Sequence, residues 1–105
     1  MTALEAKRAA DNFNQELFKR TLEKATKYFN KEIEEAACQG SYEFCIKSDN
    51  DYLIMALGQK ETIELFHSSD LQKEIKKRFR VDGFLVNFEK GYERDYVRVS
   101  WREPY

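Results

Sequence analysis

The chain has 105 residues, and its 18 basic and 19 acidic residues leave a formal net charge of −1. This length predicts a single domain over residues 1–105, because hydrophobic cores divide only in longer chains. Hydrophobic residues make up 42%, which favours a packed core over a disordered chain. No run approaches the roughly 18–20 apolar residues of a membrane span, and the polar N-terminus lacks a signal-peptide core. We therefore expect a cytoplasmic protein with no membrane partner.

The first third of the chain predicts one long helix over residues 3–38. This segment contains neither Pro nor Gly, and strong helix formers dominate it. Thr2 and Glu5 have the spacing of a capping box, and Gly40 supplies the stop. Such a helix spans about 54 Å, whereas a compact domain of this size is about 35 Å across. It must overhang, bend or break, and the weak helix formers at residues 11–14 mark the expected position of a kink.

Two apolar stripes with different directions run along this helix. The longer stripe has core-facing spacing and comprises Phe18, Leu22, Ala25, Phe29, Ile33 and Ala36. The other stripe lies about 100° around the helix and comprises Ala6, Ala10, Phe13 and Leu17. Leaving Phe13 and Leu17 in water forgoes about 1.5–3 kcal/mol each. We therefore predict that this second stripe binds another copy of the chain, giving a homo-oligomer, with a dimer favoured.

The remainder of the chain alternates strand and helix patterns. Residues 41–47 alternate as a half-buried strand does, and residues 48–51 form a polar turn. Residues 52–57 are one apolar run, which fits a returning strand or a short helix because periodicity cannot decide a run of six. Residues 61–67 predict at most one weak helical turn.

A second, shorter helix is expected after Ser69. Leu71, Ile75 and Phe79 form its apolar edge, and strands are predicted at residues 84–88 and 97–102. The predicted fold class is α+β, with the long helix and the shorter helix packed on an antiparallel sheet of about four strands.

The residues that carry enzyme or metal chemistry are sparse. His67 is the only histidine, and no nucleophile or orienting partner can be assigned to it by spacing. Cys38 and Cys45 are too few for a disulfide scaffold or a tetrahedral metal site. The four glycines are isolated, so no phosphate-binding loop is present. We therefore predict no catalytic residue, no metal and no cofactor.

Basic residues concentrate in residues 68–80, which have a local excess of three positive charges. They are Lys73, Lys76, Lys77, Arg78 and Arg80, with Arg94, Arg98 and Arg102 as further candidates. Such an edge could hold phosphates. Against this, the chain has no overall positive excess, and its aromatic residues mostly occupy core positions. A solvated helix surface is favoured, and nucleotide or nucleic-acid binding is the alternative.

The order of these features resembles small accessory proteins of tailed bacteriophages and prophages. Those open with an alanine- and charge-rich helix, here residues 1–6 (MTALEA), and a glycine then leads into a strand, here residues 40–46. A helix runs into a glycine–aromatic step, here Gly83-Phe84, and the closing strand ends in Ser100-Trp101. Residues 51–67 are not covered and look like an insertion. The resemblance implies a viral accessory role inside a bacterium, and it carries over no site residue. Together with the absence of a catalytic pattern, it leads us to predict a non-enzymatic protein that binds a host protein in the bacterial cytoplasm.

Overall fold

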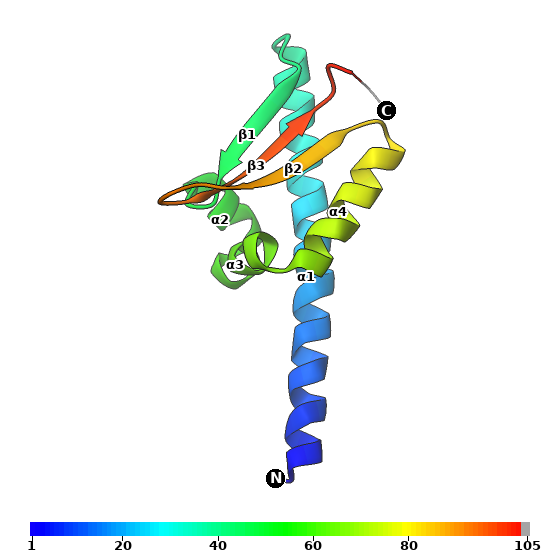
Figure 1. Cartoon of the computed structure of the whole chain (residues 1–105), viewed down its shortest axis with the longest axis vertical. Coiled ribbons are helices and arrows are strands. Elements are labelled where there is room, and N and C mark those ends of the chain that lie inside the picture. The colour runs from blue at the N-terminus through cyan, green and yellow to red at the C-terminus, as the bar shows by residue number, and fades with distance from the viewer. Residues whose placement is uncertain (104–105) are drawn as a thin grey trace.

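The computed structural model describes residues 1–103, and the α+β class is confirmed. In chain order the elements are α1 (Ala3–Cys38), β1 (Glu43–Lys47), α2 (Asp51–Leu57), α3 (Gln59–His67), α4 (Ser69–Val81), β2 (Leu85–Lys90) and β3 (Asp95–Ser100). Within these residues the strands form one antiparallel sheet in the order β1-β3-β2 (Figure 1). One face of that sheet is buried against the helices. The other, which carries Cys45 and Asn87, is open to solvent.

The sheet has three strands rather than about four because the apolar run at 52–57 is helical. The Asn50 side chain accepts a hydrogen bond from the Leu53 backbone N–H at 3.1 Å, which caps α2. Leu53 and Leu57 lie one turn apart and are both fully buried. Gly58 ends the helix with φ +101°, a conformation that glycine adopts without steric cost.

The segment after Gly58 is more helical than its sequence pattern indicated. Residues 59–67 form the complete helix α3, whose Leu65 and Phe66 are buried. The next helix, α4, is capped by Ser68 rather than Ser69, since the Ser68 hydroxyl accepts from the Leu71 backbone N–H at 3.2 Å. The predicted apolar edge of α4 is confirmed, because Leu71, Ile75 and Phe79 are all buried.

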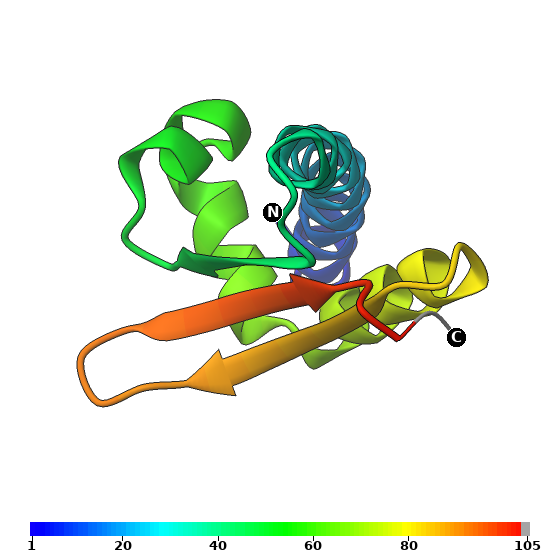
Figure 2. The same cartoon turned by 90° about the horizontal axis from the view of Figure 1, so that it is seen from above.

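The core forms where the longer stripe of α1 meets the sheet and α4. Phe29 is fully buried at its centre, with ring centroids 6.0 Å from Phe44 on β1 and 5.9 Å from Phe79 on α4. Ala25 and Leu22 are buried one and two turns earlier, respectively, which confirms the direction predicted for this stripe. Figure 2 shows α1 end-on beside the sheet, with α2 and α3 next to it.

The helix α1 is longer than the body that it supports. It is one unbroken helix that continues through residues 11–14, and its N-terminal part projects from the body (Figure 1). The molecule measures 56 × 29 × 23 Å, and its radius of gyration is 15.3 Å against about 13 Å for a compact domain of this size. We call residues 3–16 the arm, and every one of them is exposed. No helix within residues 1–103 combines the length and apolarity needed to span a membrane.

Candidate functional site

The arm carries most, but not all, of the predicted oligomer face. Ala6 and Ala10 are exposed, and Phe13 is 51% exposed. Leu17, however, is only 8% exposed, so the expectation that it lacks a core within its own chain is wrong. The reason is the position of Leu17 along α1. Lys60 of α3 lies over the Phe13 ring at 5.7 Å and Glu61 of α3 reaches α1 one turn beyond Leu17, so the body begins there.

The junction between arm and body is polar. Arg20 donates from Nε to Glu61 Oε1 at 2.7 Å, and Lys24 donates from Nζ to the Leu57 carbonyl at 3.3 Å. Burial by itself would raise the pKa of Glu61. A hydrogen bond from its own backbone N–H, the hydrogen bond and charge of Arg20 and the charge of Lys24 outweigh burial, so this pKa is lowered. These contacts fix α3 against α1 at the base of the arm.

The charges of the arm divide along its length. Residues 3–9 carry Glu5, Lys7 and Arg8, a net charge of +1, whereas residues 10–16 carry Asp11 and Glu16, a net charge of −2. Lys7 and Asp11 form an ion pair at 2.9 Å, one turn apart. The arm is therefore weakly positive toward its tip and negative toward the body.

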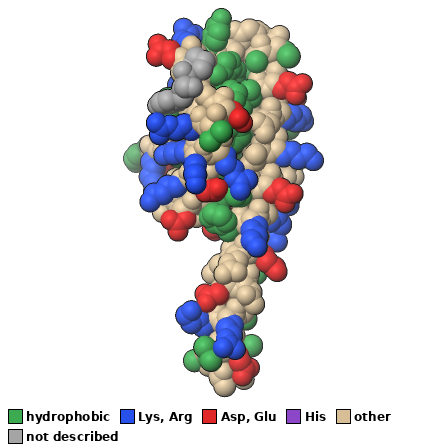
Figure 3. Space-filling view, turned by 90° about the vertical axis from the view of Figure 1, so that its right-hand side faces the viewer, with side chains coloured by type: hydrophobic (Ala, Val, Ile, Leu, Met, Phe, Trp, Pro, Cys, Tyr) green, Lys and Arg blue, Asp and Glu red, His purple; other side chains and the backbone are tan. Residues whose placement is uncertain are grey.

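The predicted basic edge lies on α4, and Figure 3 shows basic side chains gathered on the face that this helix presents. Four of its five members, Lys73, Lys76, Lys77 and Arg80, line one surface hollow of about 490 Å³ together with Val81. The fifth, Arg78, does not line this hollow and instead pairs with Glu74 at 3.2 Å.

The other arginines considered for this edge have local partners elsewhere. Arg98 lies on the open face of the sheet, 3.6 Å from Glu43 and 3.5 Å from Glu89 on the flanking strands. Arg94 pairs with Asp49 at 3.3 Å, and Arg102 lies over the Tyr42 ring at 5.0 Å. The structure does not join them to the α4 hollow.

His67 has neighbours that the sequence did not bring together. With Ser48 and Asp95 it lines a hollow of about 170 Å³. The Ser48 hydroxyl accepts a hydrogen bond from the Asp95 backbone N–H at 3.1 Å, which fastens the turn after β1 to the start of β3. Within residues 1–103 the His67 ring has no hydrogen bond to Ser48 or Asp95, so this trio lacks the contacts of a catalytic triad.

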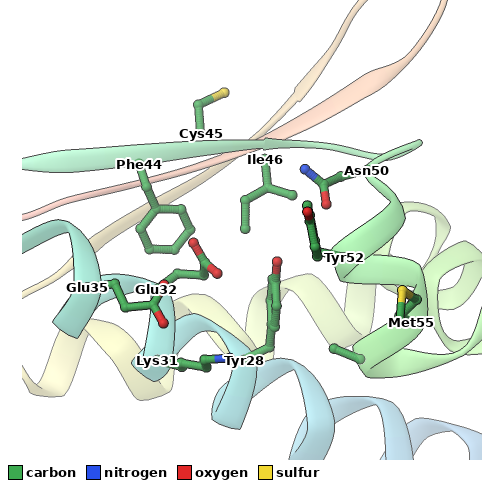
Figure 4. A pocket seen from close by; sticks show the side chains of 11 residues that line it. Tyr28, Lys31, Glu32, Glu35, Phe44, Cys45, Ile46, Asn50, Tyr52 and Met55 are labelled. Carbon is green, nitrogen blue, oxygen red and sulfur yellow. The ribbon is translucent and has the colours of Figure 1, made fainter.

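A larger cavity, of about 620 Å³, lies between α1, β1 and α2 and was missed by the sequence reasoning. Phe44 and Ile46 point from β1 into it, Tyr28 rises from α1, and Tyr52 comes from α2 (Figure 4). Cys45 points from β1 to the opposite side of the strand (Figure 4). The alternation of residues 41–47 pointed to the β1 wall. The residues that α2 contributes to the cavity could not be predicted, because the pattern of residues 52–57 fits either a strand or a helix.

The same cavity holds two carboxylates and one ammonium, all from α1. Glu32 and Glu35 lie one turn apart, and Lys31 is beside them. Burial, followed by the negative charge of Glu32, a hydrogen bond to Glu32 and the charge of Glu35, raises the pKa of Tyr28 to about 12. The Tyr28 hydroxyl is therefore protonated at neutral pH and sits in a negative local field.

No protein-family model, curated protein or solved structure matches this chain. Among residues 1–103 there is also no group of three or more His, Cys, Asp or Glu side chains placed to hold a metal ion. The functional inference therefore depends on three surfaces of the chain itself: the arm, the basic hollow of α4 and the cavity beside Tyr28.

Proposed function

We propose that this chain is a non-enzymatic accessory protein that acts by binding proteins and that it forms a homodimer through the arm. The observation that carries the proposal is the arm itself, about 21 Å of helix that is exposed along its whole length. Most side chains of the arm have no tertiary packing within their own chain, although such packing normally supplies most of the stability of a helix. A partner helix along the Phe13 side of the arm supplies that packing.

A second copy fits the arm by size and by charge. Two arms that meet antiparallel across a two-fold axis place the weakly positive outer half of each arm beside the negative inner half of the other. The alanines of the arm permit close approach of the helices. Covering the exposed half of each Phe13 ring contributes about 1 kcal/mol.

The further partner that we propose is a host protein, with the bacterial cytoplasm as the site of action. Its support is the resemblance to phage accessory proteins at both ends of the chain, together with surfaces that remain exposed outside the arm. Tyr52 and Met55 on α2 and Ile63 on α3 are large apolar side chains that the chain itself leaves uncovered.

Sedimentation equilibrium of the intact chain tests the dimer. We expect Phe13→Glu to raise the dimer dissociation constant at least about tenfold, because it removes two apolar contacts per dimer and adds two charges. Tyr92→Glu is the matched control, since Tyr92 is a fully exposed aromatic residue outside the arm. A chain that stays monomeric at high micromolar concentration, or a dimer that Phe13→Glu leaves unchanged, would refute this proposal.

A second candidate function, sequestration of a nucleotide or nucleic acid, is favoured by one observation: four cationic side chains converge on the α4 hollow. Binding of a fluorescent oligonucleotide over a salt series tests it, because phosphate contacts give a steep salt dependence. Lys73→Glu with Lys77→Glu should abolish binding. Lys7→Glu with Lys47→Glu, which makes the same charge change elsewhere, should not. Equal loss in both double variants would exclude a specific site at α4.

A further inference from the structure

The cavity between α1, β1 and α2 has walls from three elements that are distant in sequence. Aromatic rings come from Tyr28, Phe44 and Tyr52, one from each element (Figure 4). A volume of about 620 Å³ falls within the range of ligand-binding pockets. Aromatic faces attract cations through their negative quadrupole, most strongly where water is partly excluded.

Acidic side chains line the same space. Figure 4 shows the Glu32 carboxylate between the rings of Phe44 and Tyr28, with Glu35 one helical turn further along α1. Lys31 offsets one of these charges, so the charged residues lining the cavity sum to −1. Carboxylates beside aromatic faces suit a planar cation, because a guanidinium can stack on a ring and donate hydrogen bonds from its edge to carboxylate oxygens.

The α2 side of the cavity is largely apolar and exposed. Tyr52 is 75% exposed and Met55 is 82% exposed, and both line the opening on the α2 side. An inorganic cation would gain nothing from these side chains. A peptide that carries apolar residues beside its cationic side chain would bury them.

We propose that this cavity binds an arginine side chain of a partner polypeptide, with the guanidinium between the aromatic rings and the two glutamates and with flanking apolar residues on Tyr52 and Met55. A host protein would be recognised at this cavity. The identity of the natural ligand therefore rests on the proposed protein-binding function, whereas binding of an arginine side chain does not. The arginine site itself lies on the body, away from the arm, and can be tested apart from self-association.

The test uses the intact chain and short capped peptides that are identical except at a central residue flanked by leucines. That residue is arginine, lysine, norleucine or citrulline, the last being the neutral counterpart of arginine. Binding is followed by backbone amide NMR shifts. The arginine peptide should bind at least about tenfold more tightly than the citrulline peptide and should shift residues 28–35, 44–46 and 50–56. Equal affinity of the two peptides, or shifts confined to other residues, would overturn the proposal, whether or not the chain dimerises.

Charge variants sharpen the result. Glu32→Gln with Glu35→Gln should weaken the arginine peptide at least about tenfold, whereas Glu23→Gln with Glu34→Gln, the same change at exposed positions of α1, should not. Lys31→Gln should tighten binding, because it removes a positive charge that lines the cavity. Tighter binding of an acidic peptide than of the arginine peptide, or weaker arginine binding in Lys31→Gln, would show that the cavity takes an anion and would contradict the proposal.

Discussion

Phe29 and Phe13 lie on the same helix, yet replacing each by alanine should have very different effects. Phe29 is fully buried and its ring packs between Phe44 and Phe79, with centroids about 6 Å away on both sides. A phenylalanine removed from such a site typically costs about 3–5 kcal/mol in lost transfer energy and cavity formation. Domains of this size commonly have only about 5–15 kcal/mol of stability. Phe29→Ala should therefore remove a large share of it.

Phe13→Ala is the matched comparison, because the residue type and the substitution are the same and only the environment differs. Half of the Phe13 side chain is already exposed, and Lys60 lies over its ring. In the monomer this change should cost at most about 1 kcal/mol. At higher protein concentration the cost should grow, since the unfolding midpoint of a dimer rises with concentration.

Urea unfolding at low micromolar concentration measures both values. Trp101, the single tryptophan, reports the transition because its ring lies within 6.4 Å of those of Phe44 and Phe84. Equal m-values would show that the two variants unfold between comparable states. A cost below about 1 kcal/mol for Phe29→Ala, or similar costs for both variants, would mean that α1 does not present its longer stripe to the core, and the reasoning about the arm would fail with it.

Three further outcomes are expected. The pKa of Glu61 is lowered on folding, so ionised Glu61 stabilises the fold above the ordinary glutamate pKa of about 4.3. This contribution is lost as the pH falls through the lower pKa of the folded state. Glu61→Gln should therefore flatten the dependence of the urea midpoint on pH over that range. Gly58→Ala should lower the free energy of unfolding by about 1–3 kcal/mol, and by more than Gly40→Ala. Both glycines have positive φ, but only at Gly58 would the added Cβ displace the Glu61 carboxylate, which Arg20 holds at 2.7 Å. Tyr28 should titrate at about 12 by ultraviolet absorbance, and Glu32→Gln should lower that pKa without returning it to 10, because burial is the largest cause of the shift. An unchanged pKa in Glu32→Gln would place this carboxylate away from the Tyr28 hydroxyl.

The fold was largely predictable because a long segment with a regular apolar period indicates its own secondary structure. The 36 residues of α1 have a capping residue, a core stripe from Phe18 to Ala36 that is buried or half-buried throughout, and a glycine after the end, and each appears where expected. Residues 52–57 were left open between strand and helix because a run of six apolar residues has no distinguishable period. The Asn50 cap and the burial of Leu53 and Leu57 favour the helix, and the sheet loses its fourth strand.

The surfaces were harder to predict because they depend on which elements meet. Sequence spacing placed Leu17 with Phe13 on one stripe, but only the position of α3 shows that the body covers Leu17. The basic hollow was foreseeable, since its residues lie on one short helix. The cavity was not, because Tyr28 and Tyr52 are separated by 23 intervening positions and converge only once β1 and α2 are in place.

The arm and the cavity lie at opposite ends of α1, and their separation makes the two proposals jointly testable. The middle of the arm lies about 20 residues from the cavity wall of α1, or about 30 Å. An antiparallel dimer centred on the arms would then hold two arginine sites about 60 Å apart. A short peptide in solution occupies one site, so Phe13→Glu should leave its affinity unchanged. On a surface dense in arginine peptides the dimer binds through both sites, and Phe13→Glu should weaken retention at least about tenfold. Equal retention of variant and wild type on that surface would show that the arms do not place two sites on one particle.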